Sequence, residues 1–252
     1  MKKILTSILP CLMFSGLLPA QTPRLSERNT IAWCNFFTTV SLAKKWSVHG
    51  EIQLRRVDGF KNTQQNLYRV GINYQPIPEF LVRVGGAYVQ TFPYGEYTLN
   101  VFGKKTEEYR FFEMIQLSHK IYSLDFSHRF MIEQRWNAKY KLSSSEKPDD
   151  WPFSNRLRYM IRCQKNIGSK KQYYLAGYDE LFTGFGKNVG ENVFDQNRFV
   201  LMIGKKISTK FRVEVGFLAQ TQQLAREING SNVFQYNRGF ICNSYFNFDR
   251  KN

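Results

Sequence analysis

Long hydrophobic runs are missing from this chain of 252 residues after its first twenty positions. A helix that crosses a bilayer needs about 20 consecutive apolar residues, and no later stretch approaches that length. Because lipid offers no hydrogen bonds to the backbone, a closed β-barrel is the other structure that can span a membrane. The sequence therefore excludes a transmembrane helix in the mature chain and leaves either a membrane barrel or a soluble protein.

Cysteine is scarce, with four residues in the chain. Cys11 lies in the N-terminal apolar run, which leaves Cys34, Cys163 and Cys242 for the mature protein. An odd number without metal-ligand spacing argues against a disulfide framework and against a zinc site. We expect these cysteines to be small apolar residues on strands, and we predict no metal and no other cofactor.

Acidic residues are few relative to basic ones. Asp and Glu number 20 against 36 Lys and Arg, which gives a formal net charge of +16, or +14 once Lys2 and Lys3 are removed. Such a charge often indicates nucleic acid, but an exported protein rarely meets any, so we predict no nucleic-acid partner. Phosphorylated lipid headgroups and small anionic solutes are the expected partners.

The first twenty residues have the composition of a secretory signal peptide. Two lysines open the chain, an apolar run follows over residues 4–18, and small Ala20 precedes polar Gln21. This order is typical of an exported protein that is cleaved after Ala20. We expect residues 1–20 to be the signal peptide and residues 21–252 to form one domain.

Alternating hydrophobicity dominates the rest of the chain. In the segment that starts at Trp46, Val48 and Ile52 fall on one side of an extended strand, while Glu51 and Arg55 fall on the other. About eleven segments repeat this pattern, which is typical of a transmembrane barrel with strands of about ten residues. We predict an all-β fold: a single antiparallel transmembrane β-barrel of about 10–12 strands, with an even number because both termini should lie on one side.

Connection lengths favour the same fold, because bacterial barrels alternate short periplasmic turns with long outer loops and a soluble Greek-key sandwich does not. The sequence predicts short connections near residues 43, 76, 120, 168 and 208, and longer ones near 61, 99, 144, 188 and 226. Residues 21–29 are expected to be a polar leader before a first segment at 30–40. The glycine-rich stretch 183–192 is expected to be a flexible loop, because no helix follows it to make a phosphate-binding turn.

Short motifs that combine arginine with glutamate or aspartate recur along the mature chain. They read Glu51-Ile-Gln-Leu-Arg55, Glu108-Tyr-Arg110, Arg129-Phe-Met-Ile-Glu133-Gln-Arg135, Arg156-Leu-Arg158-Tyr159, Tyr178-Asp-Glu180-Leu-Phe182 and Phe194-Asp-Gln-Asn-Arg198. In this order they resemble the domain of unknown function 2490, a family of predicted outer-membrane barrels of Gram-negative bacteria with no assigned activity. The resemblance implies the fold and the outer membrane as the location, but no reaction.

The predicted inner face carries more arginines than carboxylates. The candidate anion-contacting residues are Arg129, Arg135, Arg156, Arg158, Arg162, Arg198 and Arg212, and the candidate salt-bridge partners are Glu51, Glu108, Asp125, Glu133, Glu180 and Glu214. One interpretation is a structural ladder of salt bridges that fills a narrow lumen. The other is a narrow anion-selective pore or a binding site for phosphorylated or carboxylated solutes, since arginine forks suit both groups. In that case Arg156, Arg158 and Arg162 contribute most, because no acidic residue interrupts their face.

Two other classes of function stay open. An exported soluble β-barrel that binds a ligand would lack a continuous apolar band around its wall. A barrel enzyme acting on lipid would need a nucleophile, a base and an orienting group, and His49, His119 and His128 show no recognisable arrangement of this kind, so we expect no catalytic site. The expected partners also include outer-membrane lipids and, through the aromatic end at Phe246 and Phe248, the machinery that assembles outer-membrane barrels.

Overall fold

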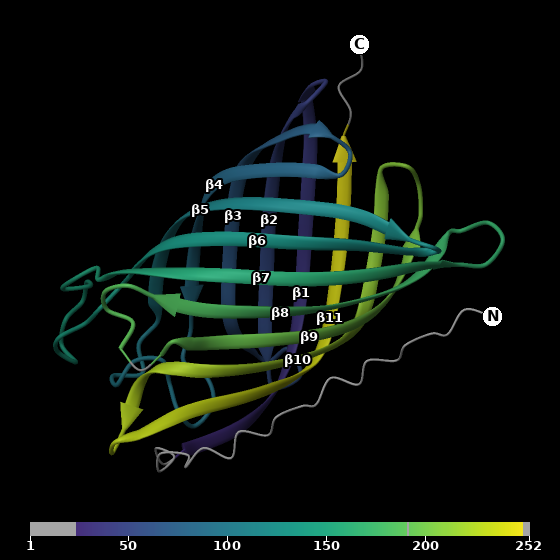
Figure 1. Cartoon of the computed structure of the whole chain (residues 1–252). Helices are drawn as coiled ribbons and strands as arrows, with labels where there is room; N and C mark the ends of the chain where they lie inside the picture. Colours follow the sequence, from purple (N-terminus) through teal and green to yellow (C-terminus); the bar gives the residue numbers. More distant parts are fainter. Residues whose placement is uncertain (1–23, 191, 249–252) are drawn as a thin grey trace, which may run out of the picture.

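Eleven strands form a closed barrel in the computed structural model, which describes residues 24–190 and 192–248 (Figure 1). The strands are β1 (Arg24–Ala43), β2 (Trp46–Val57), β3 (Asn62–Ile77), β4 (Phe80–Thr91), β5 (Thr106–Ile121), β6 (Leu124–Asn137), β7 (Phe153–Ile167), β8 (Tyr173–Phe185), β9 (Phe194–Lys206), β10 (Phe211–Ile228) and β11 (Ser231–Phe248). The predicted all-β barrel is confirmed. The predicted signal peptide, residues 1–20, lies outside the described residues.

The barrel closes through a parallel pair, β1 with β11, while consecutive strands pair antiparallel. Figure 1 shows the yellow β11 running beside the purple β1. Their register extends from Arg24 opposite Asn232 to Val40 opposite Phe248. The expected even number is therefore wrong, because an odd barrel closes when one pair of neighbours is parallel.

The start of β1 also differs from the prediction. Residues 24–29, expected to belong to a polar leader, lie in β1 because they pair in register with residues 232–237 of β11. Gly239 of β11 permits the close approach of the two strands, since a Cβ atom there would lie 1.7 Å from the carbonyl oxygen of Ile31. At the same seam Cys34 and Cys242 are register partners, and both are free thiols.

The strands contain between 12 and 20 residues, so they are longer than expected. Barrel strands are tilted, and in Figure 1 the strands of the near wall cross those of the far wall steeply. The connections 92–105, 138–152 and 186–193 are long, as predicted, and we call the barrel end that carries them the loop side and the opposite end the turn side.

The strict alternation of short and long connections is wrong at two places. The hairpin of β10 and β11 continues until residues 229–230, because polar residues beyond Gln220 extend the ladder, and the β2–β3 connection covers only residues 58–61. The glycine-rich stretch likewise begins inside β8, which ends at Phe185.

An apolar belt covers the outside of the barrel. Each strand contributes at least one exposed large hydrophobic side chain, for example Phe36, Ile52, Val70, Val84, Ile115, Ile132, Leu157, Leu181, Leu201, Val215 and Phe240 in the order β1 to β11. The predicted facing of β10 is confirmed, because Val215 is 47% exposed while the neighbouring Glu214 is 0% exposed. Among the described residues, no helix has the length and hydrophobicity needed to cross a membrane.

The interior combines apolar and polar side chains. Trp33, Leu218 and Ile241 belong to one buried apolar cluster on the β1, β10 and β11 wall. Phe112 and Met131, from β5 and β6, belong to another. The polar side chains between these walls form the site described next.

Candidate functional site

Inward-facing charged side chains from neighbouring strands meet inside the barrel. Period-two alternation turns Glu133 of β6, Arg110 of β5 and Arg158 of β7 toward the lumen, where all three are buried. The register of β6 and β7 places Glu133 directly opposite Arg156. The alternation and register of the strands therefore bring glutamate and arginine side chains together inside the barrel.

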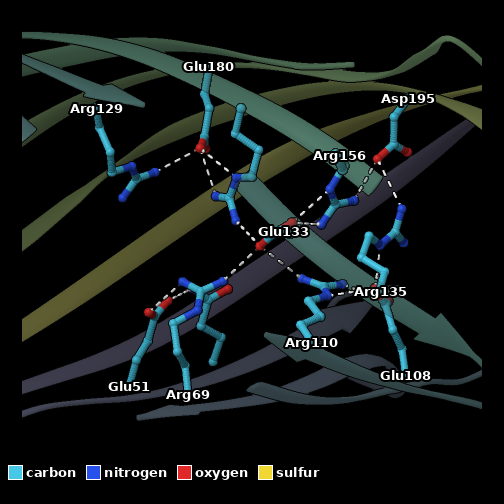
Figure 2. A network of polar contacts seen from close by, with 12 residues as sticks. Glu51, Arg69, Glu108, Arg110, Arg129, Glu133, Arg135, Arg156, Glu180 and Asp195 are labelled. Carbon is cyan, nitrogen blue, oxygen red and sulfur yellow. Dashed lines mark hydrogen bonds and ion pairs between the residues drawn. The ribbon is translucent and has the colours of Figure 1, made fainter. Parts of the chain in front are cut away.

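Glu133 lies at the centre of these contacts, as Figure 2 shows. Its Oε1 is 2.7 Å from Nη1 of Arg158, and its Oε2 accepts a hydrogen bond of 2.8 Å from Nε of Arg156. Arg69 of β3 and Arg110 lie 3.5 and 3.7 Å from the same carboxylate. A carboxylate that is 0% exposed is thus neutralised by guanidinium groups from three strands.

The surrounding carboxylates extend the network in both directions. Glu180 of β8 is 2.7 Å from Arg158 and 2.8 Å from Arg129. Glu51 of β2 is 2.7 Å from Arg69. These contacts link β2 and β3 to β8 through the lumen, so they join opposite parts of the wall.

Glu108 of β5 and Asp195 of β9 complete the network on the loop side. Glu108 contacts Arg110 at 2.7 Å and also Arg135, while Asp195 contacts Arg156 at 2.5 Å. We define the ionic cluster as Glu51, Arg69, Glu108, Arg110, Arg129, Glu133, Arg135, Arg156, Arg158, Glu180 and Asp195. Since buried charges require partners, this cluster both fills the lumen and fixes the strands around it.

A smaller polar group lies nearer the turn side around Glu214. Arg162 is 2.6 Å from this carboxylate, and the hydroxyls of Tyr174 and Tyr245 donate to it at 2.9 and 3.0 Å. The guanidinium of Arg212 lies 4.1 Å from the centre of the Tyr245 ring. This group is separate from the ionic cluster.

Most of the predicted anion-contacting arginines have carboxylate partners. The five with a close partner are Arg129, Arg135, Arg156, Arg158 and Arg162. Arg198 is 3.9 Å from Glu180, and Arg212 has no carboxylate within salt-bridge distance among the described residues. The structural ladder predicted from the sequence therefore accounts for the first five.

Two acidic residues depart from the predictions. Asp125, expected to neutralise a lumen arginine, instead lies 3.0 Å from exposed Lys120 across the β5–β6 turn, because it is the second residue of β6. Asp195 was not predicted to face inward. Phe182 pairs with Gln196 and Thr183 with Phe194, so Asp195 is the extra residue of a β-bulge, which breaks the alternation and turns it inward.

A polar cavity of about 630 Å³ lies between the ionic cluster and the loop side. Its described lining contains seven basic side chains and three acidic ones, and it includes parts of the connections 92–105, 138–152 and 186–193. Glu27 of β1 holds the first of these loops, because its carboxylate accepts hydrogen bonds of 2.6 and 3.1 Å from the backbone N–H groups of Glu96 and Tyr97. The cavity thus combines a positive lining with a loop folded against the barrel.

The three histidines lie outside this cavity. His49 is 3.9 Å from Glu51 and 3.3 Å from the hydroxyl of Thr39. His119 and His128 stack on each other with ring centres 5.2 Å apart. Within the described part of the chain, no group of three or more His, Cys, Asp or Glu side chains could hold a metal ion.

The chain is similar to a known protein family and to a solved porin structure. The model of a family described as "Protein of unknown function (DUF2490)" matches residues 30–232. No curated protein matches the chain. A solved structure titled "Anion-selective porin from Comamonas acidovorans" is similar over 77% of this chain and 53% of its own, with 9% sequence identity and a TM-score of 0.37. The chain therefore spans about half the length of that porin.

Proposed function

This chain belongs to the DUF2490 family, and from that premise we propose that it is an outer-membrane β-barrel whose arginine-rich lumen binds small phosphorylated or carboxylated solutes. The observation that carries the proposal is the pairing of an outward apolar belt on every strand with a loop-side cavity of positive lining. An apolar outer surface can contact lipid, and a cavity with a positive lining can attract anions.

The outward apolar belt favours a location in a membrane over an exported soluble barrel. Soluble proteins rarely expose continuous apolar surface of this extent, whereas a transmembrane barrel requires it around the whole wall. The alternative of an exported soluble binding barrel would leave these side chains without a partner.

The ionic cluster favours binding of solutes in the lumen over their free passage through it. Six arginines and five carboxylates pair with one another across the lumen, so a solute has to disturb buried ion pairs to pass them. Any conducting path is consequently narrow, and the excess of basic groups on the loop side makes it selective for anions. We propose binding without catalysis, so a barrel enzyme acting on lipid is the less favoured alternative.

Fractionation of cells that express the full chain tests this proposal. We expect the mature protein to begin at Gln21, to sediment with outer membranes after a high-salt wash, and to migrate differently on gels before and after boiling. The start at Gln21 follows from the signal-peptide pattern, and the sedimentation and the mobility shift follow from a lipid-embedded closed barrel. Recovery in the soluble periplasm would contradict the membrane location and favour the soluble binding barrel.

A further inference from the structure

Two arginines that line the loop-side cavity are held by glutamines instead of carboxylates. Nη1 of Arg55 donates to Oε1 of Gln65 at 2.6 Å, and its Nη2 donates to Gln53. Among the described residues no carboxylate lies within salt-bridge distance of Arg55. Neutral acceptors therefore position this guanidinium without compensating its charge.

Arg198 has a similar environment. Its Nη2 donates to Oε1 of Gln196 at 3.1 Å. Its nearest carboxylate is Glu180 at 3.9 Å, and that group already accepts much shorter contacts from Arg129 and Arg158. Most of the positive charge of Arg198 is thus uncompensated.

The guanidinium groups of Arg55 and Arg198 both lie against the indole ring of Trp33. The guanidinium carbons of Arg55 and Arg198 lie 3.9 and 4.9 Å from the centre of the Trp33 ring. Both side chains are buried, with 6% and 7% exposure, and both line the cavity. Buried charges without a close counter-ion are costly, so these two side chains are suited to an acceptor that carries negative charge.

We propose that Arg55 and Arg198 form a phosphate-binding site in the wall of the loop-side cavity. Two largely uncompensated cations match a phosphate monoester, which carries a charge of about −1.5 to −2 at neutral pH, better than a single carboxylate. Forked guanidinium groups also fit the several acceptor oxygens of phosphate. The inference rests on the proposed function, because the solute reaches the site through the lumen.

The cavity has room for more than the phosphate group. Its volume of about 630 Å³ lies within the range of pockets that hold small organic molecules. Phe102 and Tyr140 from two loops line the same cavity and offer apolar contact to an organic part. The geometry therefore points to a phosphorylated small molecule as the ligand class.

Calorimetric titration of the refolded mature chain in detergent micelles tests the site, with glycerol 3-phosphate, inorganic phosphate and acetate as probes at equal ionic strength. We expect glycerol 3-phosphate to bind about tenfold or more tightly than acetate. Arg55→Gln and Arg198→Gln should each weaken the binding of glycerol 3-phosphate about tenfold or more. The affinity of Arg55→Lys should lie between those of the parent and of Arg55→Gln, because lysine keeps the charge but lacks the forked guanidinium. Arg24→Gln is the matched control, because Arg24 also lies over an aromatic ring, that of Phe234, but is exposed and does not line the cavity, and it should leave binding unchanged.

The outcomes separate this site from the proposed function. Equal weakening by Arg24→Gln and Arg55→Gln, in variants that keep heat-dependent gel mobility, would show diffuse electrostatics and overturn the site. Acetate binding without binding of either phosphate would overturn it too, but would leave the proposed function standing. Equal affinity for inorganic phosphate and glycerol 3-phosphate would keep the two-arginine site and overturn the assignment to a phosphate ester. Phosphate binding by a protein found in the periplasm would overturn the membrane location and keep the site.

Discussion

At the scale of single residues, Glu133 offers the clearest prediction. Its carboxylate lies within 4 Å of four arginines, and each of those guanidinium groups is buried. Replacing Glu133 by Gln keeps the shape but leaves the surrounding positive charge without its central partner. We expect Glu133→Gln to lower the free energy of unfolding by about 3–5 kcal/mol, measured by urea titration of the refolded barrel with tryptophan fluorescence.

Glu79 provides the matched control for that measurement. It is an exposed glutamate in the β3–β4 turn, with no ion-pair partner among the described residues. The same chemical change, Glu79→Gln, should alter the free energy of unfolding by less than about 1 kcal/mol. If both variants lost the same stability, the buried ionic cluster would not be the reason.

At the scale of strands, period-two alternation predicts which side chains face inward wherever the strand is regular. It placed Val215 outside and Glu214 inside, and it placed the arginines of β7 in the lumen. Alternation fails at Asp195, because a bulge adds one residue to β9 without a sequence signal that the pattern can detect. The contact of Glu133 with Arg69 was equally unpredictable, since Arg69 lies three strands away around the wall and meets Glu133 only across the closed lumen.

The parallel seam is the element that the sequence pattern could not predict. The alternation predicts about eleven segments, but the hydrophobic pattern of β1 and β11 is the same for parallel and antiparallel neighbours. The direction of pairing depends on how the sheet closes, which is a property of all eleven strands together. The seam therefore needs a test of its own.

Cys34 and Cys242 allow that test, because they are register partners across the seam. Neighbouring strands lie about 4.8 Å apart, which is within the Cα separation that a disulfide allows. Mild oxidation of a Cys163→Ser variant, with a disulfide reagent as oxidant, should join β1 to β11 and give a boiled chain with faster mobility on a non-reducing gel. Cys34→Ser in the same background is the control and should show no such band. Absence of the crosslink at this pair would contradict the parallel register.

At the scale of the whole molecule, the distribution of charge determines which ions can approach the lumen. Five carboxylates balance all but one of the six arginines in the ionic cluster, whereas the lining of the loop-side cavity adds four basic groups and one acidic group from outside that cluster. Arg158 is a poor position for testing selectivity, because its charge holds both Glu133 and Glu180 and its reversal would disturb the fold. Arg226 is better suited, since it lines the cavity and donates from Nε to the backbone oxygen of Thr98 at 2.9 Å, outside the ionic cluster.

We therefore predict a small anion-selective conductance when the refolded protein is inserted in a planar bilayer. Reversal potentials in a salt gradient should show anion preference in the parent, because the basic lining lowers the energy of anions and raises that of cations. Arg226→Glu should reduce or reverse this preference, since it places a negative charge in the cavity lining. The same change of charge at Lys147, which is exposed in the connection 138–152, should leave the preference unchanged because solvent screens it. Cation preference in the parent would contradict the prediction, and a closed trace would restrict the lumen to binding, since the ionic cluster would then block even small ions.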